Sequence, residues 1–354
     1  MKKICQIYLP SFHRSYGEET FGVVTKLLPT LKKASFVGIY LIALWRDGGF
    51  DNGFDVVEYS PNPKFGTEEE FKTIIERAHE LGMTIGVDVV PNHVSDEHIL
   101  AKNCLNGVAG YEDCLYCVNG DEARRLTDAG VPSFFGKFAY SKFGDRYVRS
   151  TFADYHQLNL NWQSQKVQEY FAKLFKRLKA LGIDFARVDC GMMLLEDVSK
   201  ADRANPFACM NPGKSIAAIR KVAGGMPLFF EWFDPSTADL FNDKPECYAL
   251  DCSYVVTGKQ NTNWNHPKLV PLVGGHDQMT AADRGLDIDE VLKKMEKSEY
   301  GFLDIQTLVG WKTDPAILPT DRKFDADLKN PNQRYRGRRP VSEFVLEFVH
   351  AFNR

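Results

Sequence analysis

Short apolar runs alternate along the chain with longer amphipathic segments. The apolar runs predict buried β-strands at residues 4–9, 36–44, 84–90, 183–188, 227–230 and 269–273. Apolar residues at helical spacing predict helices at residues 21–33, 68–81, 167–181, 213–222, 288–297 and 341–352. The helix at 68–81 also has a capping-box pattern, with Thr67 as N-cap and Glu70 three residues later. Near-continuous apolar strands separated by helices are typical of a parallel sheet buried on both faces, and about seven or eight such units predict an α/β fold of the (β/α)8 TIM-barrel type.

Two regions interrupt this alternation. Residues 94–161 contain scattered glycine, aspartate, asparagine and aromatic residues with little periodicity, and a structureless loop of that length is uncommon in a compact domain. We therefore expect a small inserted domain at 94–161, after the third strand, and a barrel built from residues 1–93 and 162–354. Residues 312–340 are polar and rich in proline and arginine, and their pattern predicts no element.

Composition excludes several classes of partner. The 354 residues are 44% hydrophobic and 26% charged, as in globular proteins, and a formal net charge of −3 gives no electrostatic basis for binding nucleic acid or an anionic membrane. The most apolar run, residues 36–45, is too short to span a bilayer. With eight irregularly spaced cysteines and no export signal, we expect reduced thiols in the cytoplasm. The chain has no phosphate-binding loop and no dinucleotide fingerprint after its first strand.

Charged and imidazole side chains follow four of the predicted strands. In a (β/α)8 barrel the functional site lies at the carboxyl ends of the strands, so these residues should meet at one rim. Each has an ordinary structural explanation alone, but four strands ending this way at the same rim are improbable by chance. The residues are Asp88 and His93 at the end of the third strand, Arg187 and Asp189 at the end of the fourth, Glu231 at the end of the fifth, and His276 and Asp277 at the end of the seventh.

These segments resemble the four conserved regions of the α-amylase superfamily, glycoside hydrolase family 13. The four regions correspond to residues 88–93, 187–189, 231–232 and 276–277. Flanking stretches at residues 53–55 with Tyr59, at 65–67 and at 158–161 also resemble the family. The match extends in order from about residue 4 to residue 280, and it identifies the insertion as the family's domain B.

The resemblance implies a role for each site residue. Asp189 would be the nucleophile, Glu231 the acid/base, and Asp277 the third carboxylate that binds sugar hydroxyls. Arg187 would keep Asp189 ionised, and His93 and His276 would donate hydrogen bonds to the same sugar ring. We expect the apolar neighbours of Glu231, Phe230 and Trp232, to raise its pKa.

Two departures from the family pattern affect the expected ligands. Cys190 to Met193 stand where relatives often continue to a Lys-His pair that helps hold calcium, and no acidic calcium loop follows the first strand. We therefore expect no bound metal and no cofactor. Phe54 stands where most relatives have tyrosine, with Asp51 three residues earlier. Sucrose-phosphorylase-like members share this pair, in which Phe54 would keep the apolar platform under the sugar and Asp51 would bind the far hydroxyls of a terminal glucose. Because few residues follow the last predicted helix, we expect a divergent member that lacks the family's C-terminal β-sandwich domain.

The resemblance predicts a retaining α-glycoside hydrolase whose partner is a small carbohydrate. It would cleave α-glucosidic bonds of short oligosaccharides or disaccharides through a covalent glycosyl-enzyme. Two alternatives remain open: transfer to a sugar or phosphate acceptor at the same site, and a non-catalytic sugar-binding or scaffold barrel. Cys104, Cys114 and Cys117, with His98 nearby, allow a zinc site, a disulfide or ordinary reduced thiols.

Overall fold

Eight parallel strands form the barrel of this computed structural model. It describes residues 1–305 except 52, 130–139, 151–155, 201, 203–207, 254–260, 262 and 275–286. The sheet order is β14-β13-β12-β11-β5-β2-β1-β16-β15, with every neighbouring pair parallel. The strands are β1 (Lys2–Tyr8), β2 (Phe36–Ile42), β5 (Thr84–Val89), β11 (Phe185–Val188), β12 (Leu228–Trp232), β13 (Cys247–Asp251), β14 (Leu269–Val270), β15 (Leu272–Val273) and β16 (Tyr300–Asp304).

The seventh strand of the barrel is split in two. β14 pairs with β13 and β15 pairs with β16, so the two halves are the two ends of the sheet order although they are adjacent along the chain. Pro271 lies between them and has no N–H to donate, but its carbonyl accepts from the backbone N–H of Phe302 at 2.9 Å. The sheet therefore closes around these residues, and the predicted (β/α)8 barrel is confirmed.

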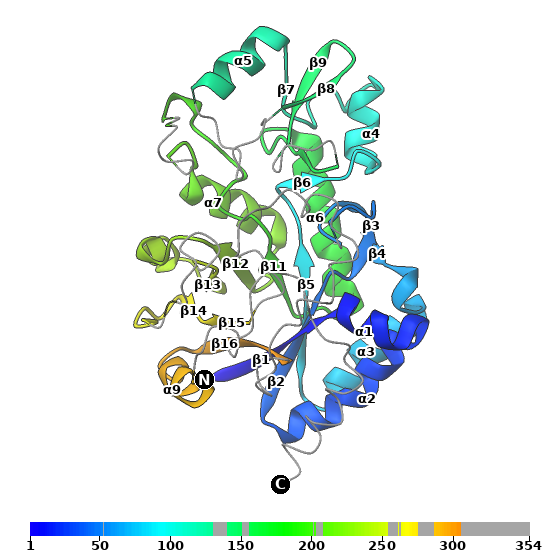
Figure 1. The fold of residues 1–354 in the computed structure, drawn as a ribbon, viewed down its shortest axis with the longest axis vertical. Coiled ribbons are helices and arrows are strands. Elements are labelled where there is room, and N and C mark those ends of the chain that lie inside the picture. Colours follow the sequence, from blue (N-terminus) through cyan, green and yellow to red (C-terminus); the bar gives the residue numbers. More distant parts are fainter. Residues whose placement is uncertain are drawn as a thin grey trace.

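Helices surround the barrel, and others lie above it with the additional strands (Figure 1). They are α1 (Leu9–Tyr16), α2 (Thr20–Lys33), α3 (Glu68–Glu80), α4 (Ile99–Leu105), α5 (Gly120–Asp128), α6 (Gln165–Leu181), α7 (Pro212–Ala223) and α9 (Ile288–Met295). Short 3₁₀ turns lie at η1 (Gly17–Glu19), η2 (Pro63–Phe65), η3 (Val198–Lys200) and η4 (Pro235–Phe241). The predicted capping box at the start of α3 is present, because Thr67 accepts from the Glu70 N–H while Glu70 accepts from the Thr67 N–H. Among the described residues, none of these helices has the length and apolarity to cross a bilayer.

The sequence pattern missed three elements of the barrel, which are β13, β16 and α1. Strand β13 is only five residues long, and no run of apolar residues marks it off from its flanks. Helix α1 follows β1 directly and has Pro10 in its first turn. Proline is tolerated in a first turn, where its missing N–H has no helical partner. The predicted helix at 341–352 and residues 312–340 lie outside the described part of the chain.

The side chains inside the barrel are apolar in its lower part and charged near the carboxyl ends of the strands. Phe185, Phe229 and Phe302 form an aromatic layer, with ring centroids 5.0–6.0 Å apart. Gly86 makes room for this layer, because a Cβ there would lie 2.0 Å from the Phe185 ring. Alternate residues further along the same strands are charged, so the apolar layer forms a floor beneath the charged residues.

Additional strands lie beyond the carboxyl end of β5. Strand β6 (His93–Val94) pairs with β10 (Leu158–Asn159), and this ladder ties together the two ends of the insertion. Strands β7 (Cys117–Val118), β9 (Arg146–Arg149) and β8 (Tyr140–Phe143) form an antiparallel sheet above the barrel (Figure 1). A hairpin of β3 (Trp45–Asp47) and β4 (Val56–Pro61) follows β2. The assignment of 94–161 as domain B stays a prediction.

Candidate active site

Four charged side chains point into the barrel from the ends of three adjacent strands. Asp88 lies on β5, Arg187 on β11, Asp189 directly after β11, and Glu231 on β12. In an extended strand, residues two apart share a face. Arg187 and Asp189 therefore follow Phe185 on the interior side, and Glu231 follows Phe229. All four are buried, with at most 6% of their surface exposed.

Arg187 connects the three carboxylates. Its Nη1 donates to Oδ1 of Asp88 at 2.9 Å and to Oδ1 of Asp189 at 2.7 Å, and its Nη2 donates to Oε1 of Glu231 at 2.5 Å. Burial alone would lower the pKa of Arg187, but the nearby Glu231, Tyr40, Asp88 and Asp189 raise it well above its ordinary value. The guanidinium therefore stays charged and compensates the buried negative charge.

Asp88 fixes the position of Arg187 from below. Its Oδ1 accepts a second hydrogen bond, from the hydroxyl of Tyr40 at 2.5 Å, whereas its Oδ2 has no hydrogen-bond partner in the described part of the chain. Burial raises the pKa of Asp88 to about 6, although Arg187 and Tyr40 lower it. The sequence had placed Asp88 at the rim without a role. Tyr40 was missed, although alternation along β2 could have placed it inside the barrel.

Glu231 is held by two donors. Besides Arg187, the backbone N–H of Cys190 donates to its Oε2 at 2.8 Å. Both contacts favour the ionised carboxylate, because each donor binds negative charge. The expected rise in the pKa of Glu231 stays a prediction, but Phe230 and Trp232 do not share the face of β12 that carries this carboxylate. Neighbouring strand residues face opposite ways, and these two rings contact Phe241 outside the barrel, with centroids 5.5 and 4.8 Å away.

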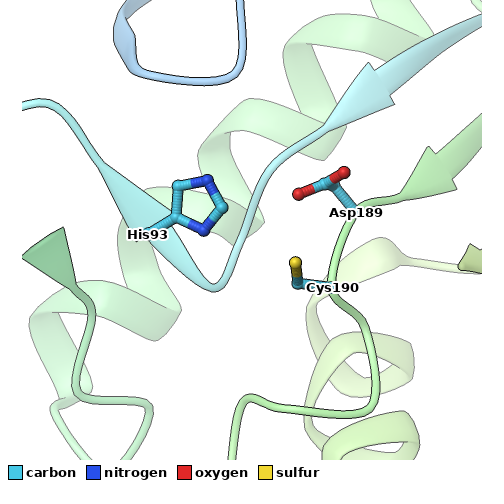
Figure 2. A group of neighbouring side chains, drawn as sticks. All are labelled: His93, Asp189 and Cys190. Carbon is cyan, nitrogen blue, oxygen red and sulfur yellow. The ribbon is translucent and has the colours of Figure 1, made fainter. Parts of the chain in front are cut away.

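His93 and Phe54 lie beside the charged cluster. The ring of Phe54 faces the Arg187 guanidinium, with 5.8 Å between ring centroid and Cζ. A ring nitrogen of His93, a carboxylate oxygen of Asp189 and the sulfur of Cys190 all lie within 4.8 Å of one another (Figure 2). Burial lowers the pKa of His93 to about 4, against a smaller opposing effect of Asp189, so its imidazole is neutral near pH 7.

Asp51 is the remaining predicted sugar-binding residue. It is 4% exposed, and its Oδ2 accepts from Nε2 of Gln157 at 2.7 Å. Asp55 shapes the loop that carries it, because its carboxylate accepts the N–H groups of Phe50 and Asp51 at 2.9 and 3.0 Å. Sequence reasoning missed Gln157, although it directly precedes the family-like stretch at 158–161.

Comparison with known proteins is consistent with this geometry. The family profile described as "Alpha amylase, catalytic domain" matches residues 6–256. The chain belongs to the alpha-amylase family. Among its relatives, the oligo-1,6-glucosidase of Bacillus cereus is 29% identical over 193 residues, which make up 52% of this chain and 34% of that protein. Maltase 1 of Drosophila virilis is 26% identical over 260 residues, or 69% of this chain and 37% of the relative.

Solved structures share the fold. The trehalose-6-phosphate hydrolase of Bacillus licheniformis superimposes with a TM-score of 0.73 at 18% identity, covering 88% of this chain and 65% of that one. This alpha-amylase-family chain matches about a third of the length of the curated relatives.

Two predicted site residues of this alpha-amylase-family chain cannot be placed. His276 and Asp277 lie outside the described residues, which stop at Gly274 just after β15 and resume at Asp287. The structure therefore brings together Arg187, Asp189, Glu231, Phe54 and His93, with Asp51 held by Gln157. The roles assigned to His276 and Asp277 stay predictions.

The cysteine cluster is not organised as a zinc site with His98. Both ring nitrogens of His98 have partners: Nε2 lies 2.9 Å from the Tyr170 hydroxyl, and Nδ1 accepts from the Leu100 N–H at 3.2 Å. All eight cysteines are free thiols, including Cys104, Cys114 and Cys117. The disulfide alternative is therefore not realised, and the reduced thiols stay a prediction.

Proposed function

We propose that this chain is a retaining α-glycoside hydrolase that cleaves α-glucosidic bonds of short oligosaccharides or disaccharides. The observation that carries the proposal is the bridge from Arg187 to both Asp189 and Glu231. One guanidinium can contact both carboxylates only if they lie close together. Retaining enzymes need such a short separation, about 5–5.5 Å, whereas inverting enzymes leave room for a water.

In the first step, Asp189 attacks the anomeric carbon. The bond to the leaving oxygen breaks as Glu231 gives that oxygen its proton, and the sugar becomes covalently attached to Asp189. In the second step, Glu231 removes a proton from water, the water attacks the same carbon, and Asp189 leaves. Both steps pass through positive charge at the anomeric carbon, which the predicted third carboxylate, Asp277, would stabilise.

The acid role requires Glu231 to carry a proton when the glycoside is bound. Arg187 and the Cys190 N–H both favour its ionised form. We infer that a bound glycoside weakens at least one of these contacts, so that the protonated carboxyl faces the leaving oxygen. His93, neutral and buried beside Asp189, is suited to donate a hydrogen bond to a sugar hydroxyl.

The preference for short substrates is supported by the loop that carries Asp51. A buried carboxylate fixed by Gln157 is suited to hold the far hydroxyls of a terminal glucose, and Phe54 offers an apolar surface to the ring. Relatives named oligo-1,6-glucosidase, maltase and trehalose-6-phosphate hydrolase support the same substrate class. The eight free thiols support the predicted cytoplasmic location.

The test combines product analysis with chemical rescue. The protein is incubated with isomaltose, maltose, trehalose and trehalose 6-phosphate, with and without inorganic phosphate, and the anomer released first is identified by NMR. We expect α-glucose. If cleavage requires phosphate and yields glucose 1-phosphate, the enzyme is a phosphorylase and the proposed hydrolysis is wrong. Sugar binding without any cleavage would support the scaffold alternative.

Rescue by azide separates the two carboxylate roles. With a nitrophenyl α-glucoside, Asp189→Gly should be inactive until azide is added and should then form β-glucosyl azide, because azide replaces the nucleophile. Glu231→Ala should form α-glucosyl azide, because azide then attacks the covalent intermediate. The same azide anomer from both variants, or full activity in Asp189→Asn, would refute the assignment.

A further inference from the structure

We propose that His93, Asp189 and Cys190 form a binding site for a thiophilic divalent cation such as Zn²⁺. A nitrogen, an oxygen and a sulfur atom from these side chains all lie within 4.8 Å of one another. The three residues are 0%, 6% and 4% exposed, so the donors are enclosed by the barrel rim. Figure 2 shows His93 approaching from the start of β6, opposite Asp189 and Cys190 at the end of β11.

The backbone at Cys190 makes the cluster possible. Consecutive residues of an extended strand point to opposite faces, so Asp189 and Cys190 would normally diverge. Cys190 instead has a φ of +47°, a left-handed conformation that is unfavourable for a residue with a side chain. This turn brings its thiol to the same side as the carboxylate, so that the sulfur lies within 4.8 Å of a carboxylate oxygen of Asp189.

The three donor types select the class of cation. Zn²⁺ binds thiolate, imidazole and carboxylate ligands, usually in a tetrahedral arrangement, whereas Ca²⁺ and Mg²⁺ bind almost only oxygen. With Zn–S and Zn–N bonds of about 2.3 and 2.0 Å, neighbouring ligand atoms are roughly 3.5 Å apart, so a small inward movement would complete the site. Three protein ligands leave the fourth position for a water molecule.

Charge and proton balance are consistent with a divalent ion. On binding, the thiol of Cys190 loses its proton to solvent, and the cation takes the place of that proton between sulfur and carboxylate. Thiolate and carboxylate together compensate two positive charges. Asp189 meets Arg187 through Oδ1, so its second oxygen can serve as the ligand.

Binding would have a direct consequence for the proposed hydrolysis. A cation on Asp189 occupies the electron pair that attacks the anomeric carbon, so metal and glycoside would compete for one site. This inhibition rests on the proposed function, but the binding itself does not, because it depends only on the three side chains.

The binding test uses CoCl₂ and ZnCl₂ with the full chain and does not measure activity. Co²⁺ reports sulfur ligation by a thiolate-to-cobalt charge-transfer band, and Zn²⁺ should displace it at one equivalent. Cys190→Ser should abolish the band, and His93→Gln should weaken binding by at least about tenfold. Cys247→Ser is the matched control, because it also removes a buried thiol, but from the first residue of β13 at the opposite end of the barrel. It should leave the titration unchanged.

Several results would overturn the proposal: no stoichiometric binding, a band that survives in Cys190→Ser, or cobalt bound without any sulfur band. If Cys190→Ser does not fold by circular dichroism, mass spectrometry of the unmodified protein decides the matter. One equivalent of Zn²⁺ should then protect Cys190, and not Cys247, from alkylation. Equal labelling of Cys190 with and without Zn²⁺ would contradict the site. Inhibition of glucoside cleavage is measured separately, so a chain that binds Zn²⁺ but cleaves no glucoside would refute only the proposed function.

Discussion

On β11 the interior positions change from apolar to charged at alternate residues, from Phe185 to Arg187 and Asp189. Arg187 bridges to Asp88 on one neighbouring strand and to Glu231 on the other. Each carboxylate is buried, and its burial is tolerable because one guanidinium pairs with it. At the residue scale, the site is therefore a single compensated charge network, whose members should respond to substitution together.

Asp88 should make stability depend on pH. Its pKa is about 6 in the folded protein, against an ordinary 3.8, so the folded state holds this proton more tightly than the unfolded state. This tighter proton binding stabilises the folded state fully below about pH 4, and the stabilisation is lost as the pH rises through about 6. The free energy of unfolding falls by at most about 3 kcal/mol over this range. Asp88→Asn cannot titrate, so its free energy of unfolding relative to wild type should rise over that range.

Urea unfolding from about pH 4 to about pH 7 measures this difference. Asp55→Asn is the control, because burial also raises the pKa of Asp55 to about 6, while its carboxylate accepts from the backbone N–H groups of Phe50 and Asp51 and not from Arg187. Each variant should remove only its own part of the pH dependence. If the free energy of unfolding changes with pH in the same way in the wild type and in Asp88→Asn, Asp88 does not titrate in this range.

Gln157 should act on substrate binding through Asp51. Gln157→Ala removes the donor at 2.7 Å from the Asp51 carboxylate. A hydrogen bond to a charged group contributes about 1.5–3 kcal/mol, so we expect KM for a short α-glucoside to rise about tenfold or more with a smaller change in kcat. The control is Gln165→Ala, on the exposed start of α6. An unchanged KM, or an equal effect of the control, would contradict this positioning role.

At the scale of elements, the charged residues depend on the apolar layer beneath them. Strand β5 carries Gly86 opposite Phe185 of β11, and Asp88 follows two residues later. Because a side chain at 86 would collide with the Phe185 ring, the small residue on one strand and the large ring on its neighbour form a complementary pair. Their fit determines how closely β5 and β11 approach at the level of Arg187.

Gly86→Ala should therefore destabilise the barrel. The added Cβ would lie 2.0 Å from the Phe185 ring, and overpacking of this kind typically costs about 1–3 kcal/mol. Phe185→Leu alone should also destabilise, because it removes apolar contact, yet the double variant should recover part of the loss. Urea unfolding of the four proteins gives the coupling energy, and strict additivity would show that the two side chains do not compete for space.

For the whole molecule, the insertion and the barrel are tied together by buried contacts. The ladder between β6 and β10 joins the two ends of the insertion at His93. Further out, Arg149 of β9 forms a two-pronged ion pair with Glu196, which follows β11. Both side chains are at most 9% exposed, so the strands above the barrel are anchored by charges that water does not reach.

Breaking this ion pair should be costly. Arg149→Met leaves Glu196 buried without its partner, which typically costs about 3–5 kcal/mol. The double variant Arg149→Met with Glu196→Leu should recover most of that stability, because no buried charge remains. Thermal unfolding compares the variants, with Arg125→Met as the exposed control, since its pair with Glu122 lies at the surface. Equal effects of Arg149→Met and Arg125→Met would contradict a structural role for the buried pair.

The sequence by itself determined the strand and helix alternation, the barrel, and the rim positions of Asp189, Arg187, Glu231 and His93. These follow from local periodicity and from the rule that parallel strands end at one edge. Only the tertiary structure decided which partners those side chains have. The Arg187 bridge, the role of Tyr40, the contact of Gln157 with Asp51 and the turned backbone at Cys190 join residues whose proximity no local pattern encodes. Contacts between strands distant in sequence depend on sheet register and backbone conformation, and these arise when the barrel closes.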